Sequence, residues 1–280
     1  MDRVLHLGPL VLPWMLLVLL GAWQLGTMVH ERLAARRGLT GGPHGWRLPL
    51  IALIAARLGF VLRYADLYAS APVAVLDIRD GGWSPWAGLG AALLYVALLW
   101  LRRSPWRQSA TAGLATFAGV WLLGWGVLQA TAPREQAALP SWQGVALDAR
   151  TVALPELKGQ PVVVNLWASW CPPCRREMPV MLQAREAQSP LSPQSQVRFL
   201  WVNQGEPPET VARFAAQQRL PAADVLLDSA GRLGSALGHK ALPTTLFYDR
   251  QGRLAAVRVG ELSAATLAQH LALISGHSAP

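Results

Sequence analysis

The chain has 280 residues, of which 52% are hydrophobic, with a mean hydropathy of +0.26 and a formal net charge of +9. This length suggests two domains, and so apolar a composition excludes one ordinary soluble protein. The positive charge forms no basic patch and no nucleic-acid-binding motif, which argues against nucleic acid as a partner. Residues 1–132 hold nine of the 13 Trp residues, and 11 Arg against five acidic residues, as is typical of a membrane segment.

Four apolar segments follow one another in residues 1–130. The first, Leu7–Met28, runs 22 residues without a charge, which is long enough to cross a hydrocarbon core of about 30 Å as a helix. A cleaved signal peptide is the alternative, but the apolar run is long and more spans follow it. These spans are Leu48–Ala65, the short segment Trp86–Leu101, and Ser109–Ala130. We therefore predict an α-helical membrane domain of four transmembrane helices over residues 1–130.

The connecting loops predict the orientation of this domain. Residues 29–47 carry four Arg and residues 102–108 carry three, whereas residues 66–85 carry one Arg and three Asp. Basic loops stay in the cytoplasm, so both termini and everything after Thr131 are expected outside it. The prediction is a multi-pass protein of the bacterial inner membrane whose cysteines lie in an oxidising compartment.

Two charges and two small residues stand out within the spans. Arg57 and Arg63 are costly there and often mark a polar cavity or a functional contact, here a contact with lipid. The alternative is that Arg63 reaches the interface and only Arg57 faces inward. Ala115 and Gly119, four residues apart, would let the last helix approach a neighbour closely.

The sequences ARLGFVLRYADLY (56–68) and LDIRDGGWSPWAGLGAAL (76–93) resemble the prolipoprotein diacylglyceryl transferase family of membrane enzymes. Over residues 45–101 the resemblance implies a lipid-contacting domain. Trp86 replaces the histidine of that family, and the C-terminal spans of the family are missing. We interpret the domain as a degenerate relative that serves as an anchor. The alternative is a lipid-modifying enzyme with an accessory thiol-reducing domain.

A linker rich in Ala, Pro and Gln, residues 131–141, precedes a second domain over residues 142–280. The apolar run Pro161–Ala168 predicts a strand, and Pro172–Gln188 predicts a helix with proline at its first position. Further expected elements are a strand at Val197–Val202, a helix at Pro207–Gln218, a hairpin over Thr244–Gly260 turning at Gly252, and a last helix capped by Ser263. This order indicates a small α/β domain around a mixed sheet.

Both cysteines of the chain lie in the stretch WASWCPPCRREMP (167–179). A thiol at the first turn of a helix has its pKa lowered by the helix dipole, so Cys171 is the expected nucleophile. Cys174, on the same turn, can attack a mixed disulfide at Cys171 and release the substrate. The neighbouring Arg175 and Arg176 could stabilise a thiolate, or could simply be solvated.

Other uses of the two thiols fit less well. A c-type haem requires His directly after Cys174, where Arg175 stands, and a zinc site requires two further ligands, for which only scattered residues such as His239 and His270 are available. A structural disulfide would close too small a loop to be a favoured staple. Binding of Cu(I) by the thiols remains an alternative. We predict no metal and no cofactor other than the redox-active disulfide Cys171–Cys174.

The segments VVVNLWASWCPPCRREMP, VNQGEPPETVARFAA and ALPTTLFYDRQGRL resemble the TlpA-like membrane-anchored thioredoxins of bacteria, relatives of those that serve cytochrome c maturation. The resemblance covers residues 139–274 and implies a thioredoxin-like domain with a cis proline at Pro243. It also implies a substrate groove and active-site support formed by Trp170, Pro172, Pro173, Leu242, Pro243 and Thr244. Pro179 matches the proline that kinks the active-site helix of the family.

One departure concerns proton transfer. Classical thioredoxins carry a buried Asp where this chain has Asn165, so the proton of the second thiol must go elsewhere. Glu177 and Glu206 are candidates, although each is explained more simply as a surface or capping residue.

These features together predict an extracytoplasmic, membrane-bound thiol–disulfide oxidoreductase. The TlpA-like resemblance implies a reductase of protein disulfides. Because the membrane half contains no cysteine, such a reductase needs a separate transmembrane thiol donor, such as a DsbD-like protein. Its expected partners are therefore protein thiols and disulfides, that donor, and membrane lipids.

Overall fold

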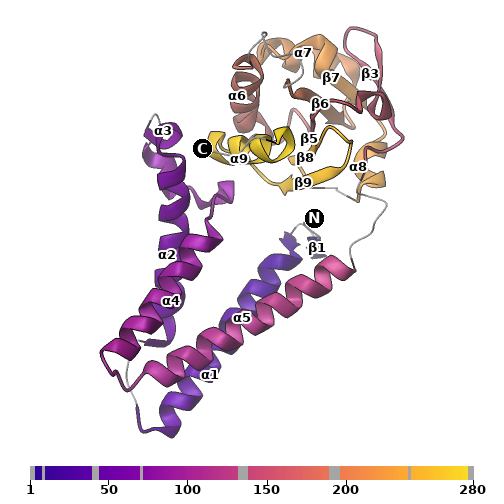
Figure 1. Ribbon diagram of the computed structural model, residues 1–280. Helices are drawn as coiled ribbons and strands as arrows, with labels where there is room; N and C mark the ends of the chain where they lie inside the picture. Colours follow the sequence, from indigo (N-terminus) through magenta and orange to yellow (C-terminus); the bar gives the residue numbers. More distant parts are fainter. Residues whose placement is uncertain are drawn as a thin grey trace. The chain divides into compact units, whose positions relative to one another are not determined.

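The computed structural model describes residues 4–7, 10–39, 44–69, 72–131, 138–188, 196–238 and 241–276. The chain divides into two compact units (Figure 1). The helical unit comprises residues 2–70 and 82–132, and the α/β unit comprises residues 133–280 together with 71–81. Each unit packs around apolar clusters of its own.

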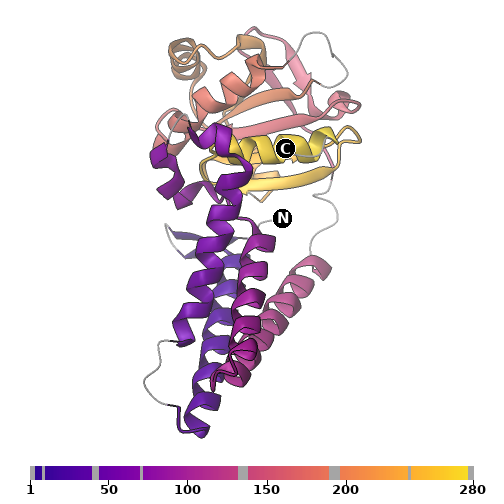
Figure 2. The ribbon, with the colours of Figure 1, turned by 60° about the vertical axis from the view of Figure 1, so that its left-hand side comes forward.

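The described part of the helical unit contains two short strands followed by helices. The antiparallel strands are β1 (Val4–Leu7) and β2 (Leu10–Pro13). The helices are α1 (Trp14–Arg36), α2 (His44–Arg63), α3 (Ala65–Ala69), α4 (Pro85–Leu101) and α5 (Arg107–Ala130). Between α3 and α4 in the sequence lie the 3-10 helices Pro72–Leu76 and Ile78–Asp80, which belong to residues 71–81 of the α/β unit. Helix α1 packs along α5, and α2 packs along α4 (Figure 1, Figure 2).

The first predicted span, Leu7–Met28, was placed too early in the chain. Its first residues pair as strands β1 and β2, and the helix begins at Trp14, directly after a proline. Helix α1 then continues to Arg36 through ERLAAR, a run of strong helix formers. The predicted cytoplasmic loop after Met28 is therefore shorter than expected.

Among the described residues, two helices are long and apolar enough to cross a membrane, Gly45–Arg63 and Arg107–Ala130. The other two predicted spans fall short for different reasons. Helix α1 carries His30, Glu31 and Arg32 in its second half, and α4 has only 17 residues. The structure therefore supports a helical region with two apolar helices of spanning length.

Close approach of α1 and α5 occurs at a glycine pair rather than at the predicted Ala115 and Gly119. A Cβ atom on Gly113 would lie 2.9 Å from the carbonyl oxygen of Gly26, and one on Gly26 would lie 2.9 Å from the carbonyl oxygen of Gly113. A Cβ atom on Gly119 would meet no atom within 4 Å. Gly26 and Gly113 thus allow α1 and α5 to approach closely. The spacing of small residues along α5 alone does not show which of them faces α1.

The α/β unit contains a seven-stranded sheet in the order β4-β3-β7-β6-β5-β8-β9 among its described residues. Its strands are β3 (Gln143–Ala146), β4 (Thr151–Ala153), β5 (Val162–Trp167), β6 (Arg198–Gln204), β7 (Val225–Asp228), β8 (Thr244–Tyr248) and β9 (Leu254–Val259). Its helices are α6 (Pro172–Glu186), α7 (Pro208–Gln217), α8 (Arg232–Ala236) and α9 (Ala264–Ser275), with 3-10 helices at Leu154–Leu157 and Ala222–Asp224. Strands β5, β6 and β7 run parallel, and the other pairings are antiparallel.

Strand β5 lies inside the sheet, between β6 and β8, and is buried along its whole length. Its side chains alternate between two apolar clusters, with Val163 and Trp167 on one face and Val164 and Leu166 on the other. Helices α6, α7 and α9 pack into the first cluster, and α8 packs into the second. Burial on both faces explains the continuous apolar run of the sequence, which only Asn165 interrupts.

The elements predicted for this unit are confirmed. Strand β5, helices α6 and α7 and strand β6 agree with the predicted ranges within two residues, and β8 and β9 form the predicted hairpin. Gly252 at its turn has a φ of +74°, a conformation that favours glycine. Ser263 accepts a hydrogen bond from the N–H of Thr266 in a capping box at the start of α9. Strands β3, β4 and β7 and helix α8 were not predicted.

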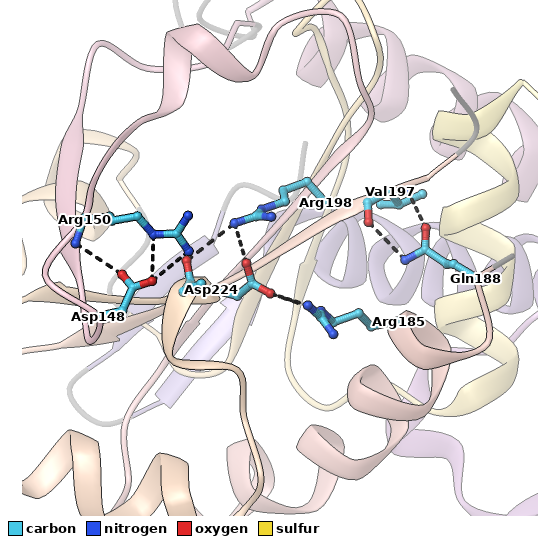
Figure 3. A network of polar contacts seen from close by, with 8 residues as sticks. Asp148, Arg150, Arg185, Gln188, Val197, Arg198 and Asp224 are labelled. Atoms are coloured by element: carbon cyan, nitrogen blue, oxygen red, sulfur yellow. Dashed lines mark hydrogen bonds and ion pairs between the residues drawn. The ribbon is translucent and has the colours of Figure 1, made fainter. Parts of the chain in front are cut away.

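A buried carboxylate ties three elements of the unit together (Figure 3). Asp224 forms ion pairs with Arg185, near the end of α6, at 2.8 Å, and with Arg198, at the start of β6, at 2.5 Å. Beyond the end of α6, the Val197 N–H donates to Gln188 Oε1 (2.5 Å), and Gln188 Nε2 donates to the Val197 carbonyl oxygen (3.0 Å). These contacts fix the end of α6 relative to β6 and β7.

Candidate active site

The two cysteines lie where β5 gives way to α6. Cys171 is the N-cap residue of α6, and Pro172 and Pro173 are its first two helical residues. Proline is tolerated there because the first N–H groups of a helix have no partner within it. Cys171 and Cys174 form a disulfide, with a Cα–Cα distance of 5.3 Å.

The geometry distinguishes the two sulfur atoms. The backbone N–H of Cys174 donates a hydrogen bond of 3.3 Å to Cys171 Sγ. A helix N-terminus and an N–H group directed at the sulfur both stabilise a thiolate. Cys171 is 3% exposed and Cys174 is fully buried, so an incoming thiol reaches Cys171 first. This arrangement favours Cys171 as the attacking thiolate and Cys174 as the second thiol.

The loop before Cys171 is held by Glu206. This carboxylate accepts hydrogen bonds from the Ser169 N–H (2.6 Å), the Ser169 hydroxyl and the Asn203 side-chain amide (2.6 Å). Burial alone would raise the pKa of Glu206, but the hydrogen bonds from Ser169 and Asn203 outweigh it and hold the pKa below its ordinary value. Glu206 is therefore an ionised group that orders the approach to the cysteine pair.

The predicted substrate-groove residues gather at the same end of the sheet. The Leu242–Pro243 peptide bond is cis, as the family resemblance implied. Thr244 begins β8 and pairs with Leu166, one residue from the end of β5, while Leu242 packs against the apolar cluster that contains both cysteines. Trp170, directly before Cys171, is 68% exposed. The cysteine pair is thus flanked by the exposed aromatic side chain of Trp170 and by the loop before β8.

Glu177 is fully buried, which corrects its interpretation as a surface or capping residue. Its Oε1 accepts a hydrogen bond from Asn165 Nδ2 (2.8 Å), and its Oε2 accepts one from the Leu262 N–H (3.0 Å). Asn165 Nδ2 also donates to Thr245 Oγ1 (2.9 Å). Glu177 lies three positions after Cys174 along α6, so both side chains lie on the same helix face.

Burial raises the pKa of Glu177 to about 8. The hydrogen bonds from Asn165 and Leu262 oppose this effect, the nearby Glu261 adds to it, and Arg258 opposes it. A carboxyl group in this state exchanges its proton close to neutral pH, which is the property that a proton-transfer group requires.

Sequence reasoning missed the partners of Glu177. Asn165 and Thr245 are polar residues inside the buried strands β5 and β8, and each lies in an otherwise largely apolar run. A polar residue in a buried strand needs a hydrogen-bond partner, and this requirement was the available signal. The backbone N–H of Leu262, 85 residues away in sequence, could not be predicted as a donor to Glu177, because no side-chain pattern in the sequence indicates a backbone contact.

The two arginines after Cys174 are exposed and engaged elsewhere. Arg175 lies over the ring of Phe214 at 5.5 Å, and Arg176 forms an ion pair with Glu261 at 2.6 Å. Neither contact directs a charge at the cysteine pair.

No cluster of three His, Cys, Asp or Glu side chains suited to a metal occurs in the part of the chain that the structure describes. His270 stacks on Phe247 at 4.6 Å, and burial together with Arg258 lowers its pKa to about 4. His239 lies outside the described residues.

The two arginines of the second predicted span differ in their surroundings. Arg57 is buried within the helical unit, donates to the Gly82 carbonyl oxygen (2.8 Å) and lies over the rings of Tyr68 and Trp83. Arg63 is exposed at the last residue of α2. The structure thus brings Arg57 to the loop before α4, and leaves Arg63 at a helix end.

Comparisons with known proteins locate the similarity in the α/β unit. The redoxin family profile matches residues 134–271 and leaves the helical unit unassigned. The thiol-disulfide oxidoreductase ResA of Geobacillus thermodenitrificans is 33% identical over 125 residues, which cover 45% of this chain and 69% of the relative. The sporulation thiol-disulfide oxidoreductase A of Bacillus subtilis is 26% identical, with 52% of this chain and 87% of that protein covered. Among solved structures, a thiol:disulfide interchange protein of the thioredoxin family from Chlorobium tepidum is 26% identical, with a TM-score of 0.44, covering 52% of this chain and all of that one.

Proposed function

The chain belongs to the redoxin family, among its ResA-like thiol-disulfide oxidoreductases, and on this premise we propose that it reduces disulfide bonds of protein substrates outside the cytoplasm. One observation carries the proposal. A cysteine at a helix N-terminus is joined to a second cysteine, and one helical turn from the latter lies a buried carboxyl group whose pKa is raised to about 8. Two-step thiol exchange needs these three groups.

In the first half of the cycle, the Cys171 thiolate attacks one sulfur of the substrate disulfide, and the other substrate sulfur leaves as a thiolate. The Cys174 thiol then gives its proton to the Glu177 carboxylate. The resulting Cys174 thiolate attacks Cys171 Sγ, forms the Cys171–Cys174 disulfide and releases the second substrate thiolate. The substrate gains two electrons, and its two thiolates take up protons from solvent.

In the second half, a thiolate of the donor attacks Cys171 Sγ and Cys174 leaves as a thiolate. Burial keeps Glu177 largely protonated at neutral pH in the disulfide state, so it returns its proton to Cys174. The second donor thiolate then releases the Cys171 thiolate, and the donor dithiol becomes a disulfide. The chain has only two cysteines, and none in its helical unit, so the donor is a separate thiol protein, which we propose to be a transmembrane, DsbD-like one.

Glu206 has a different part in this proposal. Its hydrogen bonds to Ser169 and Asn203 and its lowered pKa favour a permanently ionised tether. It therefore holds the segment before Cys171 and does not exchange protons during the cycle.

The substrate is expected to bind along Trp170 and the loop before β8. The exposed Trp170 supplies apolar contact area, and Pro172 and Pro173 leave the face of the helix start without N–H donors of their own. Because the Pro243 carbonyl oxygen accepts the Gly260 N–H and Thr244 pairs with both neighbouring strands, the backbone of Leu242, directly before the cis bond, is the proposed pairing point for a substrate chain. This surface suits an unfolded or extended peptide that carries a cysteine.

The helical unit is proposed to be a four-helix membrane anchor in the bacterial inner membrane. Large apolar side chains are exposed along α2, α4 and α5, among them Leu62, Leu94 and Leu123, which suits contact with lipid. Trp86, at the start of α4, is 82% exposed, as is common for Trp at a membrane interface. With the arginine-rich segments 29–47 and 102–108, which comprise helix ends and the connections between them, in the cytoplasm, both termini and the α/β unit lie outside it.

Lipid contact is proposed for Arg63 but not for Arg57. The exposed Arg63 at the end of α2 suits contact with lipid headgroups. Arg57 is engaged with Gly82 and two aromatic rings, which suits a role in holding the loop before α4.

The proposal is tested with the full chain in detergent. The reduced protein is expected to reduce insulin disulfides, and Cys171→Ser is expected to abolish this activity. The reduction potential of the pair, measured by equilibration with glutathione, decides the direction. A value near that of thioredoxin, about −270 mV, supports a reductase, whereas one near that of DsbA, about −120 mV, would overturn the proposal.

A further inference from the structure

A buried asparagine links Glu177 to the strand that begins at the substrate loop. Asn165 on β5, Glu177 on α6 and Thr245 on β8 are each fully buried. The Asn165 amide nitrogen lies 2.8 Å from Glu177 Oε1 and 2.9 Å from Thr245 Oγ1, and donates to both. Both amide hydrogens are therefore used, whereas Asn165 Oδ1 has no hydrogen-bond partner among the described residues.

The same site fits the opposite orientation of the amide. Rotation of the Asn165 amide by half a turn exchanges its oxygen and nitrogen, so that Oδ1 faces Glu177 Oε1 and Thr245 Oγ1. An ionised carboxylate has no hydrogen to donate to this oxygen, but a carboxylic acid has one, and the threonine hydroxyl donates as readily as it accepts. One orientation thus matches ionised Glu177, and the other matches protonated Glu177.

The second carboxylate oxygen fixes where the proton resides. Glu177 Oε2 accepts a hydrogen bond from the Leu262 backbone N–H, a group that donates only. The proton of the acid is therefore carried on Oε1, the atom that faces Asn165. In either orientation the amide makes two hydrogen bonds and leaves one polar atom unpaired, so neither protonation state is favoured by the number of bonds.

We propose that Asn165 is a positioning residue whose amide rotates with the protonation of Glu177, which keeps the carboxyl group hydrogen-bonded and in place in both protonation states. The inference rests on the proposed function, in which Glu177 exchanges a proton with Cys174 in each half-cycle. An aspartate at this position would instead bring a second negative charge next to the ionised Glu177.

Other charged and titratable groups also surround Glu177. Arg258 on β9 is the register partner of Thr245, and Glu261 lies between β9 and α9. His270 on α9 is neutral near pH 7 because its pKa lies at about 4, and Cys174 precedes Glu177 on α6 itself. Of these groups, only Cys174 changes its charge during the cycle, so the exchange between Cys174 and Glu177 sets the orientation of the amide.

The test uses the side-chain amide hydrogens, which NMR of the oxidised full chain in detergent observes directly. The chain has two asparagines, so labelling with ¹⁵N-asparagine gives two side-chain amide nitrogen signals, each with a pair of hydrogen signals. Asn203 is an internal control, because its amide nitrogen donates to Glu206 and its oxygen accepts the Glu206 N–H (3.2 Å), which fixes its orientation.

The decisive probe is the Asn165 amide hydrogen that faces Thr245, because Thr245 does not titrate. A rotating amide loses this hydrogen bond together with the one to Glu177 when the carboxyl group takes up its proton. The NMR signals of both Asn165 amide hydrogens are then expected to shift upfield together on acidification. The midpoint pH of this shift is expected to equal that of the ¹³C signal of the Glu177 carboxyl carbon. A fixed amide would shift one hydrogen and leave the one facing Thr245 bonded, and this result would overturn the inference.

Two variants complete the test. In Glu177→Gln neither Asn165 resonance is expected to titrate, and in the near-isosteric Thr245→Val only the hydrogen facing Glu177 is expected to move. Insulin reduction by the same proteins, after their cysteine pairs have been reduced with dithiothreitol and the excess reductant removed, separates the two proposals. An inactive wild-type protein would contradict the proposed function, whereas an active protein with a fixed Asn165 amide would contradict only this inference.

Discussion

Glu177→Gln is expected to remove a pH dependence that the buried carboxyl group imposes on the stability of the α/β unit. Burial raises the pKa of Glu177 from 4.5 to about 8. Because the folded state binds this proton more tightly than the unfolded chain, its stabilising contribution is complete below pH 4.5 and is lost as the pH rises through 8. At about 1.36 kcal/mol per pKa unit, the loss over this window is about 5 kcal/mol.

His270 contributes with the opposite sign, which shapes the curve of the wild-type protein. Burial and Arg258 lower its pKa from 6.5 to about 4, so its contribution is complete above pH 6.5 and is lost as the pH falls through 4. The two effects oppose each other between pH 4.5 and 6.5, where stability is expected to be nearly level. Between pH 6.5 and 8 only Glu177 acts, and the wild-type protein is expected to lose about 2 kcal/mol.

The measurement is pulse proteolysis of the oxidised full chain in increasing urea, which follows loss of the intact α/β unit at each pH. Linear extrapolation gives the free energy of unfolding. The introduced glutamine preserves the size of Glu177 and mimics its neutral form, so the difference between the two proteins isolates the carboxyl ionisation. This difference is expected to grow steadily from pH 5 to 8, and a constant difference would refute the reasoning.

Four further outcomes are expected from other substitutions. Cys174→Ser is expected to stop the reaction after the first attack and to accumulate a mixed disulfide with insulin, seen as a gel band that dithiothreitol removes. Asp224→Asn leaves two arginines without their counter-charge and is expected to destabilise the α/β unit by about 3 kcal/mol in the same urea titration. Gly113→Ala places a Cβ atom 2.9 Å from the backbone of the facing helix and is expected to lower the melting temperature of the helical unit, whereas Gly119→Ala, in open space, leaves it unchanged. Glu206→Gln is expected to lower insulin reduction equally at every pH, because it loosens the loop before the cysteines without touching the group that titrates.

Local patterns were sufficient to predict the position of the cysteine pair. The apolar run ending at Trp167 identifies a buried strand, and the prolines after Cys171 identify a helix start, because each pattern reflects backbone preferences within a few residues. The hairpin around Gly252 and the cap at Ser263 were predictable for the same reason. The thiol chemistry follows from this strand-to-helix junction alone.

The environment of the pair could not be predicted in this way. Glu177 is buried because Asn165, 12 residues earlier, and the Leu262 N–H, 85 residues later, meet its two oxygens. Such contacts depend on the register of β5, β8 and the segment before α9, which no local pattern encodes. The close contact of Gly26 with Gly113 could not be predicted for the same reason, since it depends on how two helices that are distant in sequence cross.

The surroundings of Glu177 and Glu206 shift the pKa values of these two carboxyl groups in opposite directions. Glu206 receives three hydrogen bonds from Ser169 and Asn203, which stabilise its charge and keep it ionised. Glu177 is held deeper in the core with fewer donors, so burial prevails and its proton is bound close to neutral pH. Only a group whose two protonation states lie close in free energy can take a proton from a thiol and return it within one cycle. The division of roles between tether and proton carrier therefore follows from the number of donors and the depth of burial, and not from the residue type, which is the same at both positions.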